Sequence, residues 1–393
     1  MMKKVYADNA ATTRLCKPAL DAMLPYLTNE YGNPSALHAL GRYAKKAVED
    51  ARETTARSIG ARPEELYFTS GGTEADNWAI QGAAELGKNT GRHILSTKIE
   101  HHAVLHPLRR LEKQGYEVTY LDVDPLGQID LNALEKAIRD DTFLITVMAA
   151  NNEIGTILPI AEIGHLAKEK GILFHTDAVQ AIGHLPIDVE AMDIDLLSLA
   201  GHKFGGPKGV GALYIRQGIR LPSYIQGGGQ ERDLRSGTEN VAGIVGLAAA
   251  LATSVTNMKI NTDKVSFLRN RLIEGLLEIP GSRLTGDPVQ RLPGNASFIF
   301  EGAEGESMIM MLDLNGICAS SGSACSSNSH ESSHILRAIG IPQPLAHSSL
   351  RLSLNEENTI EDIDTILEKL PLILTRLRAI SPVWGGYGRT FGT

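Results

Sequence analysis

Between residues 60 and 216, short apolar runs alternate with segments of helical periodicity, and this alternation constrains the fold more than any other feature. The apolar runs are ELYFTS, HILSTKI, TFLITVMAA, ILFHTDA and DLLSLA, and the helical segments between them include TEADNWAIQGAAEL, HAVLHPLRRLEK and IAEIGHLAKEK. Strands that alternate with helices favour a mostly parallel sheet with helices on both faces. The sequence therefore predicts an α/β fold.

The chain has 393 residues, more than one hydrophobic core usually serves, so we expect two domains. The helical segment TENVAGIVGLAAALATSVTNM ends the first unit, and the polar stretch 259–264 leads into the second. The predicted large domain comprises residues 15–260. Residues 1–14 and 261–393 are predicted to form a smaller α+β domain, with strands NASFIFEG and SSLRLSL and a final helix that Pro371 is expected to kink.

Charge and apolar patterning argue against several classes of partner. The formal net charge is −8 and the basic residues are dispersed, so the sequence lacks the Lys/Arg cluster of a nucleic-acid binder. The N-terminus has no apolar core of a signal peptide, and no run of about 18 apolar residues occurs, so we expect a cytoplasmic protein without a membrane partner. Cys16, Cys318 and Cys325 show no CxxC spacing, which argues against a disulfide framework or a metal site.

Polar side chains follow several of the predicted strands. The carboxyl ends of parallel strands meet at one edge of a sheet, and ligands of α/β proteins bind there. The residues at these positions are Thr73, His101, Asn152, Asp177 and Lys203. We therefore expect them to converge on one site.

The segment SGGTEADNWAI places a glycine-rich turn between a strand and a helix. Backbone N–H groups and the positive end of the helix can bind a phosphate at such a turn. Taken alone, a helix capped by Thr73 with Glu74 in its first turn is an equally good interpretation. The GxxxxGK[ST] spacing of a Walker motif is absent.

Each of the other candidates also has an ordinary structural interpretation. Asp177 can pair with a ring nitrogen that must stay protonated, but an aspartate at a strand end is more often a helix cap. His101 and His102 can stack on a ring or move protons, or they can be surface residues. Lys203 in AGHKFGGPKGVG can form a Schiff base, or it can be one of many solvated lysines.

The three cysteines differ in their surroundings. Cys325 lies in CASSGSACSSNS, a run of small residues in which a thiol is accessible and can react. Cys318 in the apolar GICAS is predicted to be a buried strand thiol, and Cys16 near the start of a helical pattern is also predicted to be structural.

Taken together, these segments resemble the cysteine desulfurases of the nitrogen-fixation and housekeeping iron–sulfur type, within the class V aminotransferase group. The resemblance runs nearly end to end and includes the long SSGSAC loop of one branch. The shared motifs, in order, are YADNAATT, YGNPSALH, FTSGGTEADN, EHHAVL, ANNEIGT, FHTDAVQ, GHKFGGPKGVGALY, GGGQE, RSGTENVAG, RLPGNASF, SSGSAC and SLRLSL. The resemblance implies a fold of pyridoxal-phosphate type I.

The resemblance also implies how the chain would hold pyridoxal 5'-phosphate. Lys203 would form the Schiff base with the cofactor, and Asp177 would pair with its pyridine nitrogen. His101 would stack on the ring and assist proton transfer, and Gln180 would contact the ring oxygen. The phosphate would be held by three residues of the same chain and one from a partner subunit: Gly72, Thr73 and His202, with Thr238 from the second chain of a homodimer.

The implied reaction converts L-cysteine to L-alanine. Asn152 and Arg351 would bind the substrate carboxylate, and a guanidinium suits that task because it can donate two parallel hydrogen bonds. Cys325 would take the sulfur as a persulfide and pass it to an acceptor or iron–sulfur scaffold protein. The alternatives are another class V reaction, selenocysteine cleavage or transamination, and a silent scaffold, which the retained Lys203, Asp177 and Cys325 argue against.

The sequence departs from the usual pattern of this family at three positions. Ala200 replaces a common serine, so one hydroxyl donor to the phosphate is missing and cofactor retention is expected to be weaker. Gly205 replaces a common tyrosine and Asn355 a common glycine. None of the proposed catalytic positions is lost.

Overall fold

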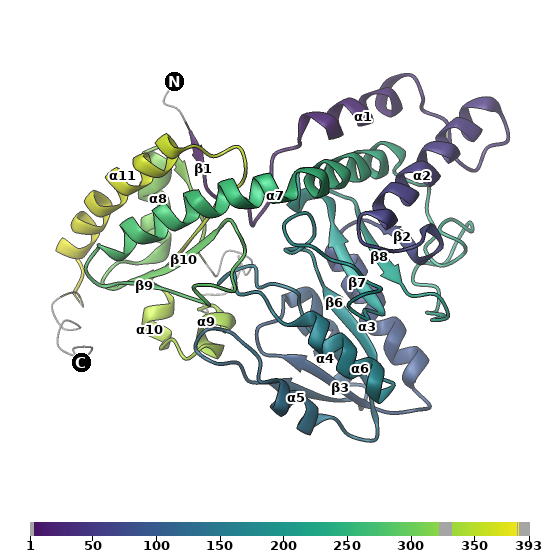
Figure 1. The fold of residues 1–393 in the computed structure, drawn as a ribbon, viewed down its shortest axis with the longest axis horizontal. Coiled ribbons are helices and arrows are strands. Elements are labelled where there is room, and N and C mark those ends of the chain that lie inside the picture. The colour runs from purple at the N-terminus through teal and green to yellow at the C-terminus, as the bar shows by residue number, and fades with distance from the viewer. Residues whose placement is uncertain (1–3, 322–331, 383, 385–393) are drawn as a thin grey trace.

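The centre of the molecule is a seven-stranded sheet, seen in a computed structural model that describes residues 4–321, 332–382 and 384 (Figure 1). The strands, in their order across the sheet, are β2 (Leu66–Thr69), β8 (Gly211–Ile215), β7 (Leu196–Ala200), β6 (Leu173–Asp177), β5 (Thr142–Thr146), β3 (His93–Thr97) and β4 (Glu117–Leu121). Only the two pairs that involve β8 are antiparallel within this sheet. The predicted α/β fold with a mostly parallel sheet is therefore confirmed.

Helices cover both faces of the sheet, and each face has its own core. The α3-side core contains α3 (Gly72–Gly87) and α4 (His102–Glu112), and the α7-side core contains α6 (Ile160–Lys170) and α7 (Val241–Leu277). Side chains of β7 alternate between them, since Leu196 belongs to the α3-side core whereas Leu197 and Leu199 belong to the α7-side core. Strands covered on both faces read as continuous apolar runs, which is why the sequence revealed them.

The edge strand β4 is not among the apolar runs of the sequence. Its first residue, Glu117, is exposed, and only its last residue, Leu121, is buried. An edge strand needs no apolar side chains on its exposed parts, so it gives a weak signal.

The helix α7 is 37 residues long and connects the two parts of the chain. It runs through the polar stretch 259–264 without a break, so the passage between the predicted domains is helical. In the described part of the chain it is the one helix long and apolar enough to span a membrane, but 44% of that window is buried inside the fold. It packs against α1 (Lys17–Thr28) and α2 (Ala39–Arg57), as the core helix of a globular protein does (Figure 1).

A third core lies at the far end of α7 and joins the two ends of the chain. It contains a three-stranded antiparallel sheet and two helices, and Val5 and Ala7 from the N-terminal segment are buried in it. Its elements are β9 (Ser282–Leu284), β10 (Asn295–Phe300), β12 (Ser349–Ser353), α8 (Gly305–Leu314) and α11 (Ile360–Ala379). The helix α11 continues through Pro371, and β1 (Val5–Tyr6) pairs with β11 (Ile317–Cys318).

Two short helices belong to the α7-side core although they follow the third core in sequence. They are α9 (His334–Ala338) and α10 (Gln343–Ala346), which bury Ile335 and Leu345. The division at residue 260 stays a prediction.

A buried ion pair fixes the loop that contains Thr238. Arg52 of α2 donates to both carboxylate oxygens of Glu231, at 2.7 and 2.9 Å, and both side chains are at least 96% buried. Glu231 also accepts from the backbone N–H of Phe68 at 2.8 Å. With φ of 46°, Glu231 lies in the left-handed region that side chains rarely adopt, so these contacts hold a strained loop in place.

We expect Glu231→Gln to lower the free energy of unfolding by about 3–5 kcal/mol, because the buried Arg52 then loses its bidentate partner and, among the described residues, keeps only the 3.3 Å ion pair with the exposed Glu49. Denaturant-induced unfolding measures the loss. The matched control is Glu53→Gln, since Glu53 pairs with Arg57 on an exposed face and should matter little. If both variants lose the same free energy of unfolding, burial does not explain the contribution of the Arg52–Glu231 pair.

Candidate active site

A pocket opens where the carboxyl ends of β2, β3, β5, β6 and β7 meet, and it encloses about 840 Å³ including its mouth. The structure brings together the predicted site residues Gly72, Thr73, His101, Asn152, Asp177, Gln180, His202, Lys203 and Arg351. The expected convergence at one sheet edge is therefore observed. Two predicted residues are not part of this lining.

Those two residues are Thr238 and Cys325. Thr238 is exposed in the loop before α7, outside the pocket of its own chain. Cys325 lies outside the described residues. Of the other thiols, Cys16 caps α1 and Cys318 lies in β11 as expected, but Cys318 is only partly buried.

Lys203 is held inside the pocket and is not a solvated surface lysine. It ends a short 3-10 turn, Gly201–Lys203, directly after β7. Its Nζ donates hydrogen bonds to the carbonyl oxygens of Ala10 at 2.7 Å and Ala11 at 2.9 Å, both from the N-terminal segment. Gln180 Nε2 donates to the same Ala10 oxygen at 2.9 Å. The amine is thus aimed by backbone carbonyls that lie more than 190 positions away in sequence.

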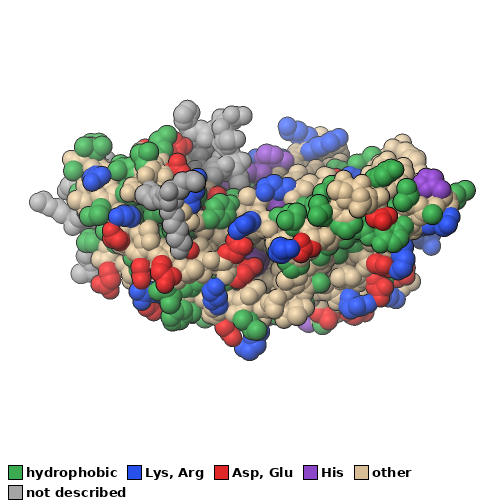
Figure 2. All heavy atoms as spheres, turned by 90° about the horizontal axis from the view of Figure 1, so that it is seen from above, with side chains coloured by type: hydrophobic (Ala, Val, Ile, Leu, Met, Phe, Trp, Pro, Cys, Tyr) green, Lys and Arg blue, Asp and Glu red, His purple; other side chains and the backbone are tan. Residues whose placement is uncertain are grey.

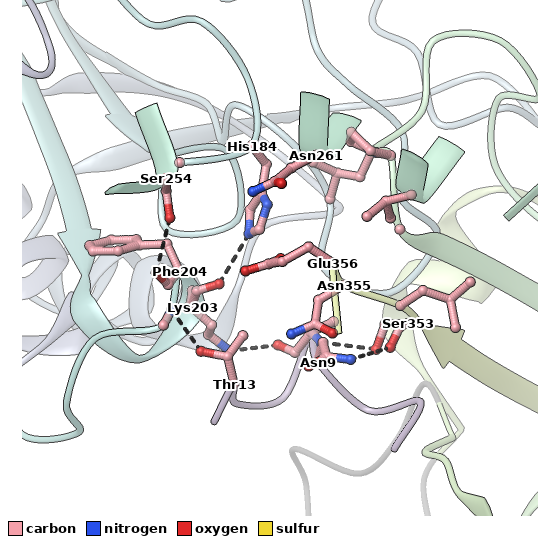
Figure 3. A pocket seen from close by; sticks show the side chains of 18 of the residues that line it. Asn9, Thr13, His184, Lys203, Phe204, Ser254, Asn261, Ser353, Asn355 and Glu356 are labelled. Carbon is pink, nitrogen blue, oxygen red and sulfur yellow. Dashed lines mark hydrogen bonds between the residues drawn. The ribbon is translucent and has the colours of Figure 1, made fainter. Parts of the chain in front are cut away.

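The turn that contains Lys203 is also fixed from behind. A second cavity adjoins this side, and Figure 3 shows the side chains around it. His184 Nε2 lies 3.0 Å from the Lys203 carbonyl oxygen, and Ser254 donates to the carbonyl oxygen of Phe204 at 3.1 Å (Figure 3). Thr13 accepts from the N–H of Gly205 at 2.8 Å. These contacts restrict the backbone on both sides of the amine.

Asp177 ends β6 and lines the pocket. Its Oδ1 accepts from the backbone N–H of Val179 at 2.9 Å, and the side chain forms no other hydrogen bond with a described residue. Burial raises the pKa of Asp177 to about 6, and the Val179 N–H and the Lys203 ammonium oppose this rise. A cation placed against its other oxygen would favour the carboxylate further.

His101 is the N-cap of α4, and its Nδ1 accepts from the backbone N–H of Ala103 at 3.1 Å. Burial lowers the pKa of His101 to about 4, so the ring is neutral near pH 7. No other hydrogen bond joins the His101 ring to a described residue. His102 does not line this pocket, and its ring packs against His106 and His334 with centroids 4.9 Å apart.

The N-terminus of α3 forms the proposed anion-binding end of the pocket. Gly72 is the first residue of this 16-residue helix, and a Cβ at Gly72 would lie 2.6 Å from the side chain of Val179. Only glycine therefore lets the helix start so close to the neighbouring strand end. His202 reaches the same wall, with its Nδ1 3.2 Å from Thr12 Oγ1. Burial and the nearby Lys203 charge lower the pKa of His202 to about 4.

Arg351 of β12 enters the pocket from the third core. Its guanidinium donates to the carbonyl oxygen of Asn152 at 2.9 Å and to Asp8 at 3.1 Å, and the residue is only 2% exposed. Arg351 Nε and Asn152 Oδ1 are both buried without a hydrogen-bond partner in the described part of the chain. Unsatisfied buried polar atoms are rare in native proteins, so these two atoms indicate a ligand with polar groups.

Sequence reasoning missed two acidic residues at this site, one paired with Arg351 and one in the pocket lining. Asp8 pairs with Arg351, and nothing in its local sequence predicts a contact 343 positions away. Asp76 lines the pocket and is 1% exposed. Its signal was present, because it shares one helical face with the buried residues Ala79, Ile80 and Ala83. An acidic residue on the apolar face of a helix is predicted to be buried, and Asp76 is.

Comparisons with known proteins agree on one family. Residues 5–366 match the family described as aminotransferase class-V. The chain is 54% identical over 381 residues to "Cysteine desulfurase IscS" of Methanosarcina thermophila, covering 97% of this chain and 94% of that one. A solved "NIFS-LIKE PROTEIN" superposes with a TM-score of 0.90 at 39% identity, covering 95% and 100% of the two chains. "SspA in complex with cysteine" gives 0.80 at 38%, covering 91% and 100%.

Proposed function

The chain belongs to the class V aminotransferases and is a cysteine desulfurase that supplies sulfur for iron–sulfur clusters, and from this premise we propose that it binds pyridoxal 5'-phosphate around Lys203. The family uses this cofactor. The observation that carries the proposal is the position of the Lys203 amine, which lies in one pocket with the buried carboxyl of Asp177.

The chemistry of the lining fits each part of the cofactor. Asp177 has an oxygen free for a protonated ring nitrogen, and the start of α3 offers backbone N–H groups to a phosphate. Lys203 supplies the primary amine that an aldehyde requires. Ala200 leaves that end without the hydroxyl expected there, so the phosphate would rely on α3 and His202. When bound, pyridoxal phosphate withdraws electrons from the α-carbon of an amino acid.

Lys203 and His101 are the groups proposed to move protons. The carbonyl oxygens of Ala10 and Ala11 favour the ammonium form of Lys203, so they can hold the amine and its proton while substrate occupies the site. In the neutral ring of His101, Nδ1 accepts a hydrogen bond from the Ala103 N–H, so the ring proton lies on Nε2, which can donate a hydrogen bond to a reacting group.

Arg351 is proposed to bind the carboxylate of L-cysteine, with Asn152 at its side. The Nε donor of Arg351 has no partner among the described residues. A substrate carboxylate could bind there and would compete with Asp8 for the Arg351 guanidinium. Burial to 2% exposure makes a second anion favourable near this cation. That one structural relative is titled as a complex with cysteine agrees with this substrate.

Cys325 is proposed as the acceptor of sulfur, on the strength of its sequence context and the family of the chain. Its thiolate attacks the sulfur of the substrate, a new S–S bond forms, and the electron pair of the broken C–S bond stays with carbon. Protonation of that carbon gives alanine, and Cys325 keeps the sulfur as a persulfide. A sulfur-acceptor or iron–sulfur scaffold protein would then take it, and the cytoplasm remains the expected location.

A homodimer is proposed because Thr238 is exposed and does not reach the pocket of its own chain. Large apolar side chains are also exposed on and between α1 and α2, among them Leu24, Leu27, Tyr31 and Leu37. Figure 2 shows hydrophobic side chains on the right half of the visible face, where these helices lie, and also on its left half. Exposed apolar groups that gather in this way favour an interface with a second copy.

We expect Lys203→Ala to abolish the visible absorbance of the bound cofactor and the covalent label left by borohydride, because Lys203 is the amine placed in the pocket. Lys208→Ala is the matched control, since Lys208 is an exposed lysine a few residues later. Absorbance spectra of both variants show whether the cofactor is bound. Mass spectrometry after borohydride reduction shows whether it is covalently linked. A label that survives in Lys203→Ala and disappears in Lys208→Ala would show that the amine is misassigned.

Co-expression of Thr238→Ala and Lys203→Ala chains tests whether the site is shared. If Thr238 reaches the neighbouring site, one site of the hybrid dimer is unaltered and the other carries both the Thr238→Ala and the Lys203→Ala changes. The hybrid should then have about half of the wild-type activity per dimer. Tags that isolate the hybrid allow the assay of alanine formation. A hybrid no more active than the mean of the two parent dimers, or a fully active monomer in sedimentation, would refute the shared site.

A further inference from the structure

Asp76 is a second carboxyl in the wall of the pocket, and the reaction above gives it no role. It lies on α3, is 1% exposed, and lines the same pocket as Asp177. Its Oδ1 is buried and has no hydrogen-bond partner among the residues that the structure describes. A carboxylate in this position would be an unsatisfied buried charge, which is far more costly than a neutral acid.

Asp76 faces the polar side chains of β6 and β7. His175 is paired in register with Leu196 of the α3-side core, and Asp177 with Ser198, so these side chains share the face covered by α3. His175 Nε2 lies 3.6 Å from Asp76 Oδ1, which is too long for a hydrogen bond.

The ring of His175 is occupied by hydroxyl groups instead. Its Nδ1 lies 2.8 Å from Thr146 Oγ1, and its Nε2 lies 3.1 Å from Ser198 Oγ. Complete burial lowers the pKa of His175 to about 3, so the ring is neutral near pH 7. Because His175 is the one base in a close pair with Asp76 in the described chain, no cation compensates a charge on Asp76.

The other ionisable groups near Asp76 also favour its acid form. Burial raises the pKa of Asp76 well above its ordinary value, and the negative charge of Asp177 adds to the rise, while Ser198 opposes it. Lys203, the nearby ammonium, acts on Asp177. Two buried carboxyl groups that lie close together do not both ionise easily, because their negative charges repel. Once Asp177 has ionised, Asp76 therefore tends to keep its proton.

We propose that Asp76 is a positioning residue that remains a neutral carboxylic acid, so that the single negative charge in this wall of the pocket falls on Asp177 and faces the ring nitrogen of the cofactor. The inference rests on the proposed function for the role of Asp177. In this proposal Asp76, together with the neighbouring His175 and Ser198, has a role of its own. These residues keep a second negative charge away from the pocket lining.

The charge state of Asp76 can be read from the protein without cofactor. A group whose pKa is raised on folding keeps a proton that the unfolded chain releases, so it makes folding less favourable as pH rises above the unfolded value. The amide of the Asp76→Asn variant has no such proton to release. From about pH 5 to about pH 7, we expect the folding equilibrium constant of Asp76→Asn to rise relative to wild type, by up to roughly tenfold per pH unit.

Glu100→Gln is the matched control for this measurement. Burial raises the pKa of Glu100 to about 8. The folding equilibrium constant of Glu100→Gln should therefore rise relative to wild type over the same pH range, which shows that the assay detects a buried acid. The measured quantity is the folding equilibrium constant of Asp76→Asn divided by that of wild type. If it stays flat or falls as pH rises, the proposal is overturned, because Asp76 would then be ionised in the folded protein. Failure of Asp76→Asn to fold would also contradict it, since an amide matches a neutral acid in size and charge.

Pyridoxal phosphate binding separates this inference from the proposed function. We expect Asp177→Asn to weaken the affinity about tenfold or more, because a charge-assisted hydrogen bond is lost, and Asp76→Asn to weaken it much less. A larger loss in Asp76→Asn than in Asp177→Asn would contradict the assignment of the charge. If the wild-type chain itself does not bind pyridoxal phosphate, the proposed function fails, whereas the stability measurement still decides the state of Asp76.

Discussion

The site depends on one buried negative charge, that of the Asp177 carboxyl at the end of β6. Removing a carboxylate from water is costly, and burial raises the pKa of Asp177, which stands at about 6 with the opposing contacts included. The Val179 N–H and the Lys203 ammonium offset part of that cost, and a protonated ring nitrogen would offset more. The neutral states of His101 and His175 follow from the same burial, because no second cation can be held there without its own counter-charge.

The topology explains how the chain brings the proposed site residues to this charge. Parallel strands deliver His101, Asn152 and Asp177 to one edge, and β8 returns antiparallel so that the turn with Lys203 stays at that edge. The third core then supplies Arg351 and the carbonyl oxygens of the N-terminal segment. The pocket therefore exists only when both ends of the chain are folded against the sheet.

Periodicity predicted the sheet, because its strands are buried on both faces, and strand ends predicted which polar residues would meet. Long-range contacts left no local trace. The pairing of Arg351 with Asp8 and of Lys203 with Ala10 joins residues 343 and 193 positions apart. The polar surface of α7 also suggested a boundary where the helix is continuous, since exposed turns of a long helix are polar whether or not a domain ends there. Asp76 does leave a local trace, because it lies on the buried face of α3 with Ala79, Ile80 and Ala83.

The most direct test of the assigned chemistry is mass spectrometry of the protein after brief exposure to cysteine. One added sulfur should be found on the peptide with Cys325, because in the proposed reaction the soft thiolate of Cys325 takes the sulfur, whereas Lys203 binds the cofactor and moves protons. Cys325→Ser should lose this label and sulfide release, yet keep the spectral change on adding cysteine. An added sulfur on Cys318 or Cys16, or full activity in Cys325→Ser, would contradict transfer through Cys325.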